Sequence, residues 1–233
     1  MIHKSIYEDP DTNDMKKIEN ADIFIQNGLG LEIFMDKIFT IYPNLKVLDA
    51  SINIKNVIKE DEVNPHVWTS IENYINQVKE ISQVLIQQNS ENKQIYEENT
   101  EKYIKDLEKV EKQYEEISQE LNGQKAICLN EALEYLAKDI KLEYISLHTD
   151  HDENSMSAES IKNIINKMNT ENIKIILIGK DDSIKNAEIL ANETNAKIYK
   201  LDTVLTGATD KSAYIDAANR NLEVLKSVLG DEK

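Results

Sequence analysis

The chain has 233 residues, of which 40% are hydrophobic and 30% are charged, a balance typical of a folded globular protein and not of a disordered one. It has 27 basic and 43 acidic residues, and the formal net charge of −16 argues against binding to nucleic-acid phosphates or to an anionic membrane surface. No apolar run approaches the roughly 20 residues that a membrane-spanning helix needs.

Short apolar runs and helical spacing alternate in the first part of the chain. Residues 21–27 and 45–50 are short, apolar and partly β-branched, which predicts two buried strands. Between them, residues 31–42 carry apolar side chains at helical spacing, so we expect a helix there. A polar, acidic loop follows and leads to the sequence Pro-His-Val-Trp at 65–68, after which residues 71–88 are expected to form another helix.

Residues 91–121 contain no Gly or Pro and are almost wholly charged, amide or apolar. Their apolar residues form a narrow stripe at alternating spacings of three and four, which predicts a helix about 45 Å long. A coiled coil is one interpretation of such a stripe. Because the stripe holds few heptads and is flanked by globular patterns, we favour a single helix with one face packed on its own protein.

The remainder alternates strand-like and helical segments. Strands are expected over residues 125–130, 142–148, 173–179 and 196–202. Helices are expected over residues 131–140, 157–168, 182–194 and 212–229. This alternation predicts a parallel sheet covered on both faces. Cys128, the single cysteine, lies in the first of these strands and is expected to be a buried, inert thiol.

We therefore predict an α/β protein with two parallel-sheet lobes joined by a long linking helix. The N-terminal lobe would span residues 1–90, the linking helix 91–121 and the C-terminal α/β lobe 122–233. Ligands of parallel α/β sheets bind beyond the carboxyl ends of the strands. The site is therefore expected in the cleft between the lobes.

Few residues suggest chemistry. No nucleotide-binding loop, catalytic triad or nucleophile elbow is recognisable, so we do not expect an enzyme. His66, in a rigid loop, is a candidate metal ligand or a surface histidine at a helix start. His148 and His151, in an acidic loop after a strand, could hold a cation or simply be solvated. Asp202 ends the last expected strand, where site residues gather, or it caps a turn.

Four segments resemble the solute-binding proteins of zinc and manganese ABC importers, a family that includes streptococcal adhesin-type lipoproteins. They are YEDPDTNDMKKIENADIFIQNGLGLE (7–32), NPHVWTSIENYINQV (64–78), YEENTEKYIKDLEKVEKQYEE (96–116) and SAYIDAANRNLEVLKSVL (212–229). The order and spacing hold over nearly the whole chain, and NGLGLE together with PHVW is a specific combination.

The resemblance implies two lobes, a rigid helical spine and a metal buried between the lobes by four ligands. The histidine of PHVW is His66, and the family's aspartate matches Asp202. The implied function is extracytoplasmic capture of zinc or manganese and its delivery to an ABC permease, with no catalytic residues. The metal is then the transported ligand, nucleic acid is not a partner, and the protein meets the membrane only through a lipid anchor absent from this chain. Its place is the cell surface or the periplasm.

Two of the four ligand positions differ from the family's pattern. Ser5 falls on the first, with His3 close by, and Asn130 falls on the third, with Glu131 beside it. Because serine and an amide are weak zinc donors, each change weakens binding unless a neighbour substitutes. We expect His3, Glu131 or the loop containing residues 148–151 to complete the site.

Family members normally carry a lipoprotein signal, a strand and a helix before the Tyr-Glu pair, so we expect the N-terminal lobe to be incomplete and the less stable half. The alternative function is that of an adhesin-like interaction protein whose metal site has degenerated. Ser5 and Asn130 favour it, whereas His66 and Asp202 oppose it. A cytoplasmic α/β enzyme would need a nucleophile or cofactor motif that we do not find.

Overall fold

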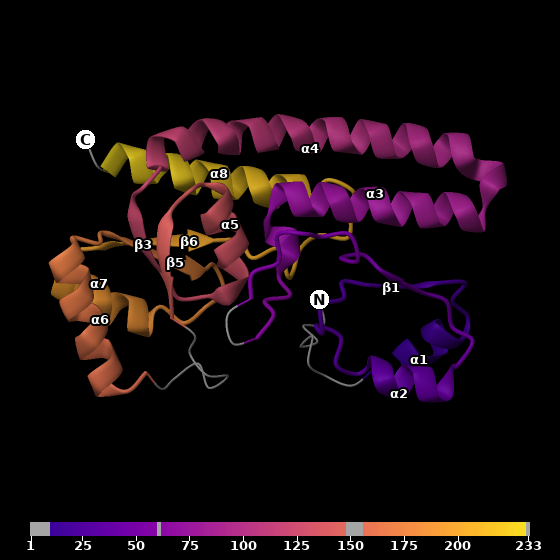
Figure 1. Cartoon of the computed structure of the whole chain (residues 1–233), viewed down its shortest axis with the longest axis horizontal. Coiled ribbons are helices and arrows are strands. Elements are labelled where there is room, and N and C mark those ends of the chain that lie inside the picture. The colour runs from indigo at the N-terminus through magenta and orange to yellow at the C-terminus, as the bar shows by residue number, and fades with distance from the viewer. Residues whose placement is uncertain (1–9, 60–61, 148–155, 232–233) are drawn as a thin grey trace. The chain divides into compact units, whose positions relative to one another are not determined.

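The computed structural model describes residues 10–59, 62–147 and 156–231 (Figure 1). The chain divides into two compact units. Unit 1 comprises residues 1–67 and 72–105, and unit 2 comprises 68–71 and 106–233. The division falls inside the long helix, between Lys105 and Asp106, so that one continuous helix contributes residues to both units.

Unit 1 is built on a small parallel sheet. Strands β1 (Phe24–Gln26) and β2 (Val47–Asp49) pair in register from Phe24 opposite Val47 to Gln26 opposite Asp49. Besides the first part of the long helix, its helices include α1 (Thr12–Glu19), α2 (Met35–Ile41) and most of α3 (Ile71–Gln88). The two strands and the second and third helices confirm the expectation from the sequence.

The first helix was not expected from the apolar pattern. Ile18 is the buried residue of α1, so hydrophobic periodicity is weak there. The helix begins instead with a polar signal, because the Asp11 side chain accepts the backbone N–H groups of Asn13 and Asp14. Asp14 in turn accepts the backbone N–H of Asp11, which completes a capping box.

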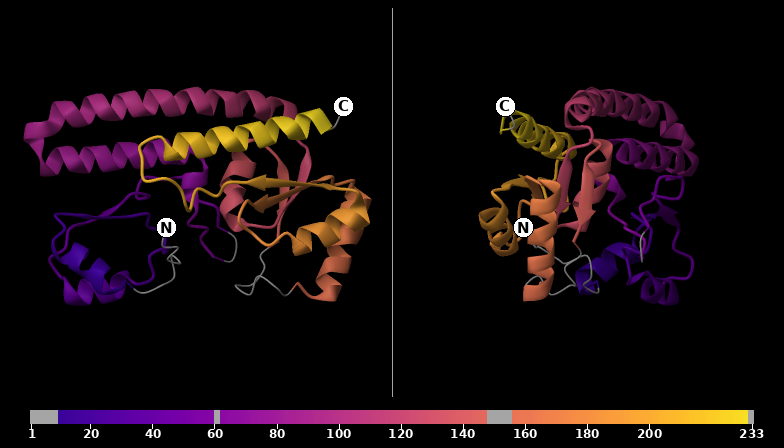
Figure 2. Two further views of the ribbon diagram at one scale, coloured as in Figure 1. Left: turned by 180° about the vertical axis from the view of Figure 1, so that it is seen from behind. Right: turned by 60° about the vertical axis from the view of Figure 1, so that its left-hand side comes forward.

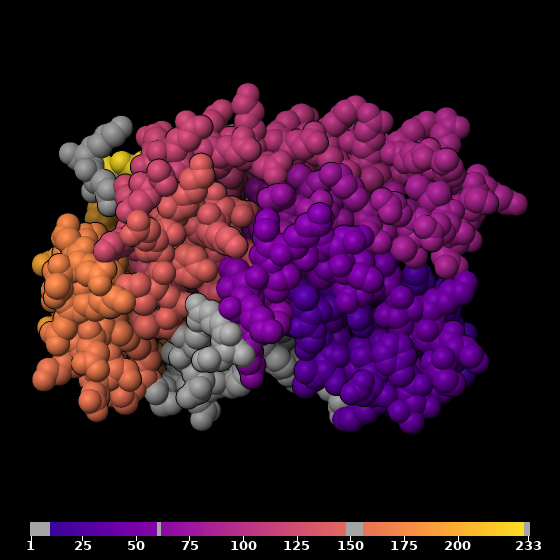
Figure 3. All heavy atoms as spheres, viewed as in Figure 1, coloured from indigo at the N-terminus to yellow at the C-terminus, as the bar shows by residue number. Residues whose placement is uncertain are grey.

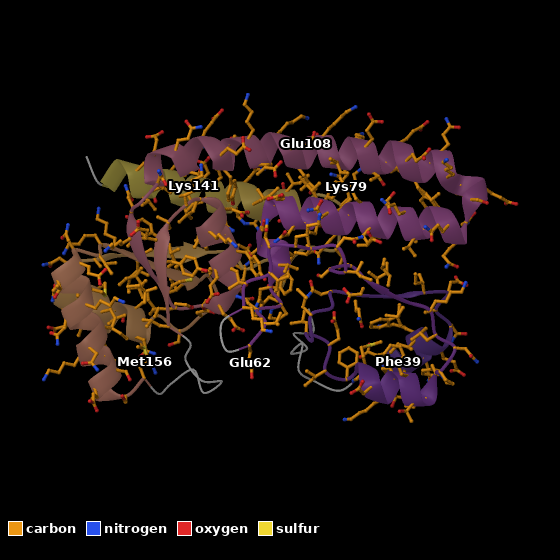
Figure 4. All side chains as sticks on the ribbon, in the orientation of Figure 1. Phe39, Glu62, Lys79, Glu108, Lys141 and Met156 are labelled. Atoms are coloured by element: carbon orange, nitrogen blue, oxygen red, sulfur yellow. The ribbon has the colours of Figure 1, made fainter. Side chains whose placement is uncertain are left out.

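Ile18, Met35 and Ile38 form one buried apolar cluster of unit 1. Further buried apolar residues among the described part of this unit include Leu31, Leu48, Ala50, Ile54, Val67 and Ile75. Large apolar side chains of the same unit remain at the surface, and Phe39 on α2, labelled in Figure 4, is 42% exposed. Within the part of unit 1 that the structure describes, Ile25, Ile33, Ile41, Ile52 and Ile95 are also exposed.

Helix α4 (Lys93–Leu121) follows a single 3-10 turn, η2 (Ser90–Asn92). Its outer side forms a long stretch of the molecular surface, coloured magenta in Figure 3. The buried face consists of Leu107, Val110, Tyr114, Ile117, Ser118 and Leu121. Because the Tyr114 hydroxyl donates to the Ala218 carbonyl of α8 (Ala213–Asp231) at 2.9 Å, the helix packs on its own protein, as predicted.

Unit 2 contains a four-stranded parallel sheet in the order β4-β3-β5-β6. The strands are β3 (Lys125–Cys128), β4 (Glu143–Ser146), β5 (Ile175–Gly179) and β6 (Lys197–Leu201). The connecting helices are η3 (Glu131–Leu133), α5 (Glu134–Asp139), α6 (Ala158–Glu171) and α7 (Lys185–Thr194). Figures 1 and 2 show α6 and α7 together on one side of the sheet and α8 on the other, so both faces are covered as the alternation predicted.

All five residues of β5 are buried, at the centre of this sheet. Ile176 and Ile178 belong to a cluster that includes Met168 of α6 and Leu190 of α7. Cys128 is fully buried and burial raises the pKa of its thiol to about 12, which confirms an inert cysteine. Within the described residues, no helix combines the length and the apolar character that crossing a bilayer requires.

Candidate metal site

His66 lies in unit 1 and is buried, with only 4% of its surface exposed, which rules out a surface histidine. The Asn64 side-chain oxygen accepts the backbone N–H of His66 at 3.0 Å and lies 2.9 Å from Nδ1 of the ring. Because an amide oxygen only accepts hydrogen bonds, Nδ1 carries the proton and the lone pair is on Nε2. Burial lowers the pKa of His66 to about 4, so the imidazole is neutral at pH 7, the form that binds metals.

The NGLGLE loop fixes the chain just before this histidine. The Glu32 carboxylate accepts the backbone N–H of Asn27 at 2.6 Å and that of Gly28 at 3.1 Å. Gly28 has a φ of +87° and lies so close to Asp49 that a side chain there would overlap the carboxylate. Asn27, held in this way, donates its side-chain amide to the Pro65 carbonyl at 2.9 Å. Two motifs that are far apart in the sequence therefore form one hydrogen-bonded structure within unit 1.

Trp68, the last residue of PHVW, belongs to unit 2 and is anchored there. Its indole N–H donates to the Thr203 carbonyl at 3.0 Å, and its own carbonyl accepts the Tyr214 hydroxyl at 2.7 Å. Thr203 directly follows Asp202. Trp68 and the loop that carries the candidate aspartate are thus hydrogen-bonded to each other within unit 2.

Asp202 follows β6 and its side chain is 3% exposed. Asn221 of α8 clamps its backbone, accepting the Asp202 N–H at 2.6 Å and donating to the Asp202 carbonyl at 2.8 Å. The carboxylate accepts the Val204 N–H on Oδ1 at 2.9 Å, and on Oδ2 it accepts Lys180 Nζ at 2.8 Å and Arg220 Nη2 at 2.9 Å. Burial alone would raise its pKa, but the hydrogen bonds from Lys180 and Arg220 outweigh burial and hold the pKa of Asp202 below its ordinary value.

Asn130 stands at the start of η3 and uses both ends of its amide within unit 2. Its oxygen accepts the Ala132 N–H at 2.9 Å, and its nitrogen donates to Asp182 Oδ2 at 2.8 Å. Asp182 also accepts the Gly179 N–H at 2.7 Å. Glu131, the neighbouring candidate, is the first residue of η3.

The candidate ligands are divided between the two units. His66 lies in unit 1, whereas Asp202 and Glu131 lie in unit 2. His3 and Ser5, and the loop with His148 and His151, fall outside the described residues. Among the residues that are described, neither unit gathers three or more His, Cys, Asp or Glu side chains in a group that could hold a metal ion.

Comparisons with known proteins agree with the motifs and the fold. The family described as "Zinc-uptake complex component A periplasmic" (ZnuA) matches residues 7–228. The chain belongs to the ZnuA family. It is therefore a member of a family of solute-binding proteins that bind metal ions for ABC importers and are not enzymes.

Individual members of the ZnuA family cover almost the whole chain. The high-affinity zinc uptake system protein ZnuA of Bacillus subtilis is 28% identical, over 95% of this chain and 76% of its own length. The crystal structure of the metal-dependent lipoprotein YcdH of Bacillus subtilis is 26% identical with a TM-score of 0.80, covering 95% of this chain and 85% of that one. A mutant structure of the laminin-binding adhesin Lmb of Streptococcus agalactiae has a TM-score of 0.81 at 22% identity, covering 95% of this chain and 86% of that one, which shows the fold.

Several residues around the candidate ligands His66 and Asp202 were missed by the sequence reasoning. Asn64, which orients His66, and Lys180, Arg220 and Asn221, which surround Asp202, have no motif of their own. The position of Lys180 offered one signal. It directly follows a predicted strand, and residues after neighbouring parallel strands meet at the same edge of the sheet.

Proposed function

We propose that this chain captures a divalent transition metal outside the cytoplasm and delivers it to an ABC permease, with zinc as the first candidate and manganese as the second. The observation that carries the proposal is the buried, neutral imidazole of His66, with its Nδ1 proton held by Asn64. A second-shell acceptor on one ring nitrogen is how proteins orient a histidine that binds metal through the other. Asp202 is proposed as a second ligand, with Glu131 and His3 as further candidates.

Membership of the ZnuA family and the zinc-uptake relative support zinc as the cargo. Zinc accepts imidazole nitrogen and carboxylate oxygen together. Manganese also accepts carboxylate and imidazole donors, so the identity of the metal rests on the geometry of the complete ligand set. The trapped metal would be released on docking to the permease.

The test is calorimetric titration of the chelator-treated full chain with zinc and with manganese. Loss of a residue that orients a metal ligand typically lowers metal affinity about 10- to 100-fold, and we expect a fall within this range for Asn64→Ala. For His66→Gln, which removes the proposed ligand itself, we expect a larger fall in zinc affinity. Asn53→Ala, which removes an exposed amide of the same unit that bonds Glu80, serves as the control and should bind like the wild type. Equal binding by all four proteins would exclude a metal site at His66.

A second candidate function has its own support. Asn130 stands at a ligand position of the resemblance, and both ends of its amide already bond Ala132 and Asp182. This favours an adhesin-like interaction protein whose metal site has degenerated. Elemental analysis of the purified protein separates the two candidates, because only the importer component retains stoichiometric metal after purification without chelator.

A further inference from the structure

Two cations of the protein itself occupy one oxygen of the candidate metal ligand Asp202. Lys180 Nζ lies 2.8 Å and Arg220 Nη2 lies 2.9 Å from Oδ2, and the carboxylate is almost fully buried. Hydrogen bonds between ionised groups are the strong class of protein hydrogen bonds. The negative charge of the carboxylate is therefore compensated by cations of unit 2 itself.

The fold builds this arrangement from two directions. Lys180 directly follows β5, and Asp202 directly follows β6, the strand that pairs with β5 through Gly179 opposite Leu201. The backbone N–H of Lys180 donates to the Leu201 carbonyl at 2.7 Å, which aligns the two strand ends. Arg220 lies on α8 next to Asn221, and Asn221 hydrogen-bonds the Asp202 backbone.

The same arrangement opposes a bound divalent ion. Lys180 and Arg220 place two positive charges at Oδ2 of Asp202, and the nearby Asp181 carboxylate lies 4.0 Å from Lys180 Nζ, so a cation that approaches Oδ2 is repelled at short range by both basic groups. A zinc ion also needs a carboxylate oxygen at about 2.0–2.2 Å, where its lone pair cannot at the same time accept a hydrogen bond. Lys180 and Arg220 both bond Oδ2, so a zinc ion that binds through this oxygen displaces at least one of them.

We propose that Lys180 is an internal competitor of the transported metal: its ammonium holds Asp202 in the empty protein, leaves when a divalent cation binds, and returns when the cation is released. This inference rests on the proposed function. Lys180 is the cation of the two that moves more readily, since its ammonium is a point charge on a flexible stem whereas the guanidinium of Arg220 is a rigid fork. After the metal leaves, Arg220 and the Val204 N–H still bond the buried Asp202 carboxylate. The returning Lys180 ammonium restores the hydrogen bond that the metal displaced, which stabilises the empty protein and favours release.

The test compares the chelator-treated full-length wild type with Lys180→Gln by calorimetric titration with zinc. Without its competitor, Asp202 should bind zinc about tenfold more tightly, because one charge-assisted hydrogen bond no longer has to be broken. Lys185→Gln removes the same charge from an exposed position at the start of α7 and should bind like the wild type. Thermal unfolding gives a second readout with the opposite sign, since metal-free Lys180→Gln should melt below the wild type.

A measurement on the unaltered protein covers the case in which Lys180→Gln does not fold. Labelling of lysines by an amine-reactive reagent, read by mass spectrometry, should show greater modification of Lys180 with zinc than without it, and unchanged modification of Lys185. Unchanged labelling of Lys180 in zinc-loaded protein would overturn the proposal.

The outcomes separate this inference from the proposed function. If zinc binding depends on His66 but Lys180→Gln binds zinc no more tightly than the wild type, the proposal that Lys180 competes with the metal is wrong. The proposal that the protein captures metal is then still supported. If Lys180→Gln binds zinc and the wild type does not, the competitor is supported and metal capture by the natural chain is overturned. If neither protein binds zinc or manganese, both proposals are wrong.

Discussion

The side-chain amide of Asn27 donates a hydrogen bond to the carbonyl of Pro65 at 2.9 Å, although 38 positions separate the two residues. The same Asn27 accepts the Gln77 amide of α3 on its oxygen at 2.9 Å. One asparagine of NGLGLE thus joins the loop after β1, the residue before His66 and the helix that follows. The position of the loop that carries His66 therefore depends on a residue outside that loop.

Asn27→Ala should lower the free energy of unfolding by about 1–3 kcal/mol, because one buried and one partly buried partner lose hydrogen bonds to it. The partners left without Asn27 are the Pro65 carbonyl and the Gln77 amide. Denaturant unfolding of the chelator-treated protein measures the change. Asn53→Ala, which removes an exposed hydrogen bond to Glu80, should cost less than about 0.5 kcal/mol, and equal losses in the two variants would contradict the prediction.

The stability of the metal-free protein should depend on pH through His66. The unfolded imidazole takes up a proton below a pH of about 6.5, whereas the pKa of the folded one is lowered to about 4. The contribution of the neutral His66 is therefore complete above pH 6.5 and is lost as the pH falls toward 4, by an amount on the order of 3 kcal/mol. Unfolding curves between pH 7.5 and 4.5 should show this slope in the wild type and a weaker one in His66→Gln. Parallel pH profiles would refute it.

Gly179→Ala should destabilise unit 2 through Asp182. A Cβ at Gly179 would lie 2.6 Å from Asp182 Oδ2, the atom that accepts the Gly179 N–H and the Asn130 amide. Displacing that carboxylate breaks both hydrogen bonds, so we expect a loss of about 1–3 kcal/mol in the free energy of unfolding. Gly230→Ala, at a position in α8 with open space around it, should be neutral or stabilising by up to about 1 kcal/mol. A Gly179→Ala protein as stable as the wild type would be unexpected.

Backbone amides in the first part of unit 1 should exchange with solvent faster than those of the unit 2 sheet. The two strands of unit 1 have three residues each, whereas β5 is buried along its whole length between two partners. Few buried apolar contacts mean low local stability. Hydrogen exchange followed by mass spectrometry should show weaker protection over 21–50 than over 173–202. Equal protection of the two segments would be evidence against this difference.

Hydrophobic spacing was sufficient to predict the β-strands, the long helix and the alternation of unit 2, because each of these depends on neighbours within one or two turns of the chain. Helix α1 was not predicted by hydrophobic spacing, because Ile18 is its one buried apolar residue and the signal for its start is a polar capping box. The motifs were enough to single out His66 and Asp202 as the residues to examine. Whether they bind one cation stays a prediction.

The partners of those residues were decided by the tertiary structure alone. Lys180 lies 22 positions from Asp202, and Arg220 lies 18 positions on the other side, yet both reach one carboxylate oxygen. No local sequence pattern predicts that these three side chains lie together, because their proximity depends on which strands are adjacent and on how α8 packs beside them. The amino-acid sequence by itself determined the elements, the family and the candidate ligands. The packing of the sheet edge determined that the candidate ligand Asp202 is held by the protein's own charges, since hydrogen bonds between distant residues form only once the chain has folded.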